Sequence, residues 1–101
     1  MSIVLTGAER RQNFALLQAI ADAIGREFES KPYDELLLIE SAPPLSRTVD
    51  GIVVSVSARA RRRPADDALS VSVDIRSDLP TPLGARPTYT FRKRRDGSVF
   101  Y

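Results

Sequence analysis

The 101-residue chain contains no cysteine and no histidine. Without cysteine there can be no disulfide, no thiolate metal ligand and no cysteine nucleophile. Without histidine the chain lacks the commonest general base and the commonest metal ligand. Few enzymes of this size work without either residue, so we expect a non-enzymatic domain with no cofactor and no metal.

Long apolar segments are also missing. No run approaches the roughly 20 apolar residues that a membrane-spanning helix needs. The first residues hold only three consecutive apolar side chains, Ile3 to Leu5, and lack the basic and hydrophobic regions of a signal peptide. We therefore expect no membrane association and a cytoplasmic location.

The remaining composition is that of a globular protein. Hydrophobic residues make up 43% and charged residues 28% of the chain, and its length suits a single core. The five glycines are scattered, so no phosphate-binding loop is visible. These features predict one folded domain over residues 1–101.

An amphipathic helix is predicted near the N-terminus. Thr6 and Glu9 have the spacing of a capping box, and Pro32 limits the other end. Apolar residues recur between them at spacings of three and four, which predicts a helix of about 22 residues with one buried face. These residues are Phe14, Leu17, Ile20, Ala21, Ile24 and Phe28.

The next apolar segment is a continuous run, Leu36 to Ile39. Periodicity does not assign such a run, but its length and the flanking prolines favour a strand buried on both faces. We therefore predict a strand over residues 33–40 and a loop over 41–50.

Two alternating segments follow and predict a hairpin. Apolar residues take every second position in 52–59 and in 69–76, with serine, charged residues and Val53 between them. Pairing Ile52 with Ile75 and Val54 with Val73 keeps apolar residues opposite each other, whereas a slip of one residue would bury serines. Residues 61–67 form the polar tip of this hairpin.

A second hairpin is predicted at the C-terminus. Residues 88–94 alternate, and Asp96-Gly97 is typical of a two-residue type I′ turn. Such a turn would place Phe100 on the face of Tyr89 and Phe91. It would place Arg92, Arg94, Val99 and Tyr101 on the opposite face.

The element order predicts an α+β fold, with a long N-terminal helix packed on one face of a four- to five-stranded antiparallel sheet in two layers. One helix covers one face only, and the second face of the middle strands is accordingly polar. The order resembles the cystatin-type arrangement of a helix gripped by a curved sheet. The resemblance is one of topology, without a cystatin-like Gln-x-Val-x-Gly loop, and it implies no function.

Charge is distributed unevenly along the chain. Residues 1–50 carry five basic and eight acidic side chains, a net charge of −3, whereas residues 51–101 carry ten and five, a net charge of +5. If the two hairpin tips are neighbours, their cations gather at one edge of the sheet and suit phosphate. The alternative is that they are solvated residues that protect sheet edges from aggregation. The residues are Arg59, Arg61, Arg62, Arg63, Arg92, Lys93, Arg94 and Arg95.

A second candidate surface is the uncovered face of the sheet, where Val53, Val99 and Tyr101 would contact a protein. The buried-strand interpretation of Leu36–Ile39 favours this surface, because one helix leaves the second face of that strand uncovered. Our first interpretation is thus a protein-binding domain that acts through a partner or as a homodimer. Bacterial immunity-type and accessory proteins are analogies of size and topology.

The alternative function is nucleic-acid binding through the arginine-rich tips. A third, a carboxylate-based hydrolase, is disfavoured because Asp34 and Glu35 would point to opposite sides of the predicted strand.

Overall fold

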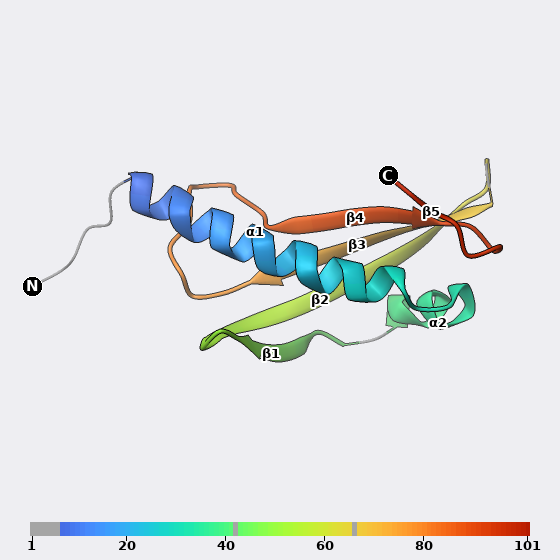
Figure 1. Ribbon diagram of the computed structural model, residues 1–101, viewed down its shortest axis with the longest axis horizontal. Coiled ribbons are helices and arrows are strands. Elements are labelled where there is room, and N and C mark those ends of the chain that lie inside the picture. Colours follow the sequence, from blue (N-terminus) through green and yellow to red (C-terminus); the bar gives the residue numbers. More distant parts are fainter. Residues whose placement is uncertain (1–6, 42, 66) are drawn as a thin grey trace, which may run out of the picture.

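The computed structural model describes residues 7–41, 43–65 and 67–101. A long helix packs on one face of a five-stranded antiparallel sheet, as predicted (Figure 1). The strands follow their order in the chain, so each pairs with the next. The elements are α1 (Gly7–Glu29), α2 (Tyr33–Leu37), the 3₁₀ helix η1 (Leu38–Ser41), β1 (Leu45–Val49), β2 (Ile52–Arg63), β3 (Ala68–Arg76), β4 (Thr88–Lys93) and β5 (Val99–Phe100).

Helix α1 confirms the predicted apolar stripe. It has 23 residues and crosses the sheet along the long axis of the molecule (Figure 1). Leu17, Ile20 and Ile24 are buried against β2 and β3, as the three- and four-residue spacing requires. Glu9 lies in the first turn, and the expected capping residue Thr6 lies outside the described residues.

Gly25 allows α1 to approach β4 closely. A Cβ atom at this position would lie 2.1 Å from Cδ1 of Tyr89, far inside van der Waals contact. A glycine within a helix ordinarily costs stability. Here the missing side chain makes room for an aromatic ring.

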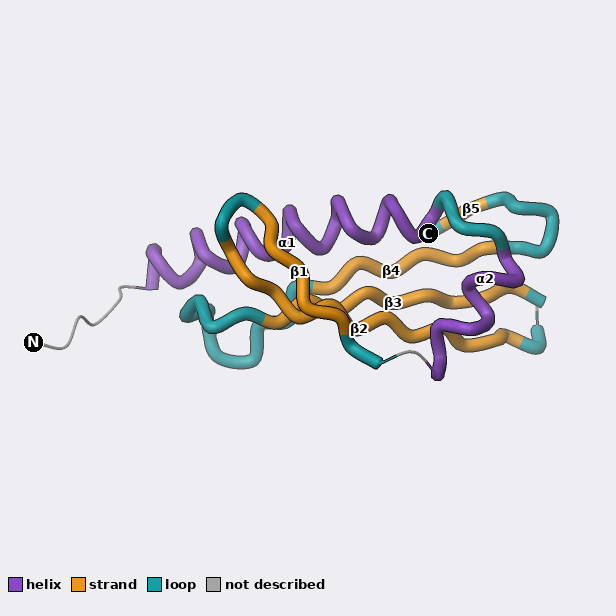
Figure 2. The backbone as a smooth tube through the Cα atoms, turned by 90° about the horizontal axis from the view of Figure 1, so that it is seen from below, coloured by secondary structure: helices purple, strands orange, loops and turns teal. Residues whose placement is uncertain are grey.

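The predicted strand over residues 33–40 is wrong, because this segment forms α2 and η1. Leu36 and Ile39, three residues apart, are buried, whereas Leu38 between them is 70% exposed. That spacing is helical, and the acidic residues after Pro32 favour a helix N-terminus. Leu36 and Ile39 therefore pack against the sheet, while Leu38 faces outward. Helix α2 crosses the strands near their tips (Figure 2).

The predicted loop over residues 41–50 instead contains the edge strand β1. It is joined to β2 by Asp50 and Gly51, whose φ angles are +51° and +79°. Two consecutive positive φ values between paired strands are typical of a type I′ turn. The sheet thus reaches five strands, but with β1 in place of the predicted strand.

The register between β2 and β3 is offset by four residues from the prediction. Val56 pairs with Ile75, and Ala60 pairs with Val71. An even offset keeps the same side chains on the same faces, so burial alone does not decide between the two registers. Strand β2 runs on to Arg63, which leaves a shorter tip than predicted.

Replacing Gly25 by alanine should destabilise the protein. Helix propensity alone would add about 1 kcal/mol to the free energy of unfolding. The clash with Tyr89 should outweigh this gain, and we expect a net loss of about 1–3 kcal/mol. Urea unfolding followed by circular dichroism measures the difference. The control is Ala23→Gly at an exposed position of α1, which should show propensity alone; a more stable G25A variant would contradict the steric argument.

Candidate nucleic-acid interface

The two basic hairpin tips lie at the same end of the molecule (Figure 1). Leu69 of β3 pairs with Lys93 of β4, which aligns the ends of the two hairpins. Arg95 Nε lies 3.0 Å from Asp67 Oδ2, so an ion pair joins one tip to the other. The two tips are therefore neighbours, which was the condition for a shared basic patch.

The pleat of the strands nevertheless divides their cations between two faces. Arg62 lies in one row with Leu69 and Lys93, on the face covered by the helices. Arg59 and Arg61 lie on the other face, which we call the open face, and Arg63 ends the strand on the same side.

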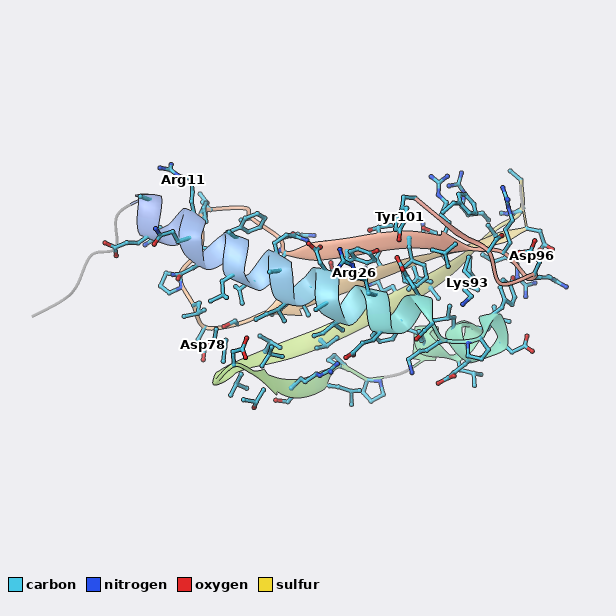
Figure 3. All side chains as sticks on the ribbon, viewed as in Figure 1. Arg11, Arg26, Asp78, Lys93, Asp96 and Tyr101 are labelled. Carbon is cyan, nitrogen blue, oxygen red and sulfur yellow. The ribbon has the colours of Figure 1, made fainter. Side chains whose placement is uncertain are left out.

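Lys93 is a structural residue. It is only 6% exposed, and its Nζ donates hydrogen bonds of 2.6 Å to the carbonyl oxygens of Glu29 and Lys31 (Figure 3). Carbonyl groups at the C-terminus of a helix lack partners within the helix and carry partial negative charge. The buried ammonium satisfies them and joins β4 to the end of α1. Lys93 is therefore withdrawn from any basic binding surface.

Arg95 and Arg62 border a pocket of about 480 Å³ beneath the tips. The Arg95 guanidinium lies 5.8 Å from the centre of the Tyr33 ring. Asp34 and Asp96 line the same pocket, and a hydrogen bond from the Ser98 hydroxyl lowers the pKa of Asp96. Lys93 also lines the pocket, but its ammonium is already bonded to two carbonyl oxygens, and the two carboxylates balance the two arginines.

The open face has a different composition. Across four strands, Arg61, Ser70, Arg92 and Phe100 form one row. The next row holds Arg59 and the hydroxyls of Ser72 and Thr90, whose oxygens are 3.3 Å apart.

A shallow hollow of about 580 Å³ lies over these rows. Arg86, from the loop before β4, lines it together with Arg59 and Arg61. Asp74 is the carboxylate that lines the hollow, and it accepts a 2.7 Å hydrogen bond from the Thr88 hydroxyl. The hollow therefore presents three guanidinium groups and several hydroxyls against one carboxylate that is already hydrogen-bonded.

The C-terminal hairpin reverses the predicted faces. Arg94 accepts a hydrogen bond from Gly97 and donates one to Ser98 through the backbone, and Gly97 has a φ of +93°. This is a three-residue turn with a bulge, rather than the predicted two-residue turn. Phe100 therefore pairs with Arg92 on the open face. A shift of one residue moves every side chain of the strand to the opposite face.

Val99 and Tyr101 consequently lie on the helix side, where they were not expected. Val99 pairs with Lys93 and packs against the core. The hydroxyls of Tyr101 and Tyr89 both donate hydrogen bonds to Glu29 Oε1, and burial, followed by the bond to Glu29, raises the pKa of Tyr89 above its ordinary value. These contacts fasten the end of the chain to α1.

Val53 is exposed on the open face, as predicted, but it is remote from the arginines. Val53 and Arg61 lie eight positions apart along β2, which puts their Cα atoms about 27 Å apart. The apolar surface expected from Val53, Val99 and Tyr101 is thus not continuous. Phe100 and Arg86 were not expected as site residues, because the turn type decides the face of Phe100 and the loop places Arg86.

A comparison of the chain with protein-family models, with curated proteins and with solved structures gives no match. Within the described residues, no three acidic side chains converge as a metal site. None of the helices in the same residues is long and apolar enough to cross a membrane. A function has to be argued from the open face and its surroundings.

Replacing Lys93 by methionine should lower the free energy of unfolding by about 1–3 kcal/mol, because two partly buried carbonyl oxygens lose their donor. Chemical unfolding of the variant measures this loss. Lys31→Met is the matched control: its surface ion pair with Glu35 should contribute about 0.5 kcal/mol or less. Equal stability of the two variants would show that Lys93 does not hold the helix end.

Proposed function

We propose that this chain is a non-enzymatic nucleic-acid-binding domain that contacts phosphate groups through the open face of its sheet. The observation that carries the proposal is the convergence of arginines from β2, from the end of β4 and from the loop before β4 on one uncovered surface. These residues are Arg59, Arg61, Arg86, Arg92 and Arg94.

The chemistry of the open face suits phosphate. Guanidinium groups bind phosphate oxygens with paired hydrogen bonds, and serine and threonine hydroxyls are frequent phosphate donors. Arg59 and Arg61 lie two positions apart along β2, so their Cα atoms are about 6.8 Å apart. At this separation both side chains can contact the same nucleic-acid backbone.

An acidic protein could meet the same arginines, but the open face lacks what such an interface needs. Protein interfaces are centred on buried aromatic and apolar side chains with a polar rim. Here the rows that hold the arginines are mainly serine and threonine, with Phe100 at their edge as the one aromatic side chain among these described residues, and Val53 lies at the far end. The surface therefore favours nucleic acid. The cytoplasmic location expected from the sequence would give the domain access to it.

The double variant Arg59→Glu with Arg61→Glu should bind a fluorescein-labelled mixed-sequence oligonucleotide much more weakly than the parent. For the parent, five phosphate contacts on a single strand correspond to a slope of about −3.5 in log K against log salt, and the double variant, which removes two of them, should have a slope shallower by about 1.4. Fluorescence anisotropy between about 50 and 200 mM salt gives both quantities.

The matched control is Arg11→Glu with Arg26→Glu, two exposed arginines of α1 (Figure 3). It changes the net charge by the same amount away from the open face. The control should keep most of the parent's affinity. Equal losses in the two double variants would mean that net charge alone causes binding and that the open face is not the site.

A second candidate function is self-association, which an apolar groove favours. The groove, of about 280 Å³, lies between the end of α1, η1 and the first residues of β1. Leu38 and Leu45 line it and are both exposed. Beside it, β1 is an edge strand whose free backbone groups can pair with those of a second copy.

Under this candidate, sedimentation velocity should give a dimer for the parent and a monomer for Leu38→Asp combined with Leu45→Asp. Charge in the groove should oppose its burial between two copies. Leu83→Asp, at a fully exposed loop position outside the groove, should remain a dimer. A monomeric parent across the concentrations tested would reject self-association.

A further inference from the structure

Phe100 is placed unusually for an aromatic side chain of this protein. The other aromatic residues of the sheet, Tyr89 and Phe91, lie on the helix side, where Phe91 is completely buried. Phe100 lies instead on the open face and is half-buried. Its ring therefore does not contribute to the core beneath α1.

Two guanidinium groups flank this ring. Arg94 Cζ lies 4.5 Å from the ring centre and Arg92 Cζ lies 5.7 Å from it. Contacts of this kind are cation–π interactions, and they hold both the ring and the cations in place. The result is an aromatic ring with two phosphate-binding groups over it, so a base that stacks on Phe100 shares the ring with Arg94 or displaces it.

The backbone turn is what creates this arrangement. With a two-residue turn at Asp96-Gly97, Phe100 would face the core and Val99 would face solvent. The observed three-residue turn places the valine against the core and the phenyl ring on the arginine-rich face. One change of turn type therefore determines that the phosphate-binding surface includes an aromatic ring.

We propose that Phe100 is a stacking platform for a nucleobase, and that the ligand of the open face is consequently a single-stranded nucleic acid. The inference rests on the function proposed above and identifies its substrate class. Bases of a duplex are stacked on one another and paired, whereas unpaired bases of a single strand stack readily on aromatic side chains. Arginine side chains beside the ring add cation–π contributions to such stacking.

The row geometry gives the path of the strand. From Phe100 to Arg61 is three strand spacings, about 14 Å across the sheet. A base on Phe100 leaves the adjoining phosphates near Arg92 and Arg94, and the strand continues over Ser70 towards Arg61. The site therefore covers a few nucleotides and crosses the strands.

The test compares three labelled probes by fluorescence anisotropy: a mixed-sequence single-stranded oligonucleotide, the duplex of the same sequence, and an abasic oligomer of equal length. The parent should bind the base-containing single strand at least about fivefold more tightly than the abasic oligomer, the loss expected when one stacked base is removed. It should also prefer the single strand to the duplex.

Phe100→Leu should remove this preference. Its affinity for the single strand should fall at least about fivefold, while its affinity for the abasic oligomer and its salt slope stay unchanged. Phe100→Tyr keeps an aromatic ring and should bind as the parent does. Thermal unfolding of each variant establishes that β5 is intact, and the parent's preference over the abasic probe tests stacking without any variant.

The two proposals fail in different ways. If the parent binds all three probes equally and R59E/R61E abolishes binding, phosphate binding stands and base stacking is wrong. If F100L binds the single strand as tightly as the parent, stacking on Phe100 is also wrong. If the parent binds none of the probes at low salt, the nucleic-acid function is rejected and the stacking platform with it.

Discussion

In this chain the helical elements α1, α2 and η1 all pack on the same face of the sheet, so only that face is removed from water. The strands therefore alternate for the most part between apolar and polar side chains. Every other feature of the molecule depends on this one-sided cover. A polar second face is required by the fold, but arginine is not, because serine and threonine would satisfy solvent equally well. The fold alone does not require arginine at these positions, and the proposed nucleic-acid ligand would account for it.

Strand β4 shows how one strand can serve two purposes. Arg92, Lys93 and Arg94 are consecutive, and in sequence they form a single basic segment. The pleat separates them, because Lys93 points inward to the carbonyl oxygens at the end of α1 while Arg92 and Arg94 flank Phe100 outside. A count of positive charge cannot distinguish the two roles. The same strand therefore anchors the helix and builds the candidate site.

The fold class and the long helix could be predicted from periodicity alone, and the alternation of β2 placed Arg59 on the correct face, whereas Arg61 was expected in the hairpin tip and lies in the strand. The predictions that were wrong concern features that the spacing of apolar residues does not determine. Leu36–Ile39 fits either a strand or a helix, and only contact with the sheet decides. Two even registers of β2 and β3 bury the same side chains, so the turn has to decide between them.

The dipeptide Asp-Gly illustrates the limit most clearly, because it occurs twice and forms two different turns. At 50–51 both residues have positive φ and make the two-residue turn, whereas at 96–97 only the glycine does and the turn has three residues. The sequence signal is identical. The surrounding pairing decides the outcome, and at the second site it decides on which face Phe100 lies.

The contact between Gly25 and Tyr89 has a consequence for how this protein can change during evolution. Any side chain at position 25 would meet the aromatic ring, so the two positions are inherited as one steric unit. A smaller residue at position 89 would make room for a side chain at position 25. It would also remove one of the two tyrosine hydroxyls that donate to Glu29, so that only Tyr101 would donate to this carboxylate. A larger residue at position 25 therefore requires a smaller one at position 89, and that change also alters the hydrogen bonding of Glu29 and Tyr101.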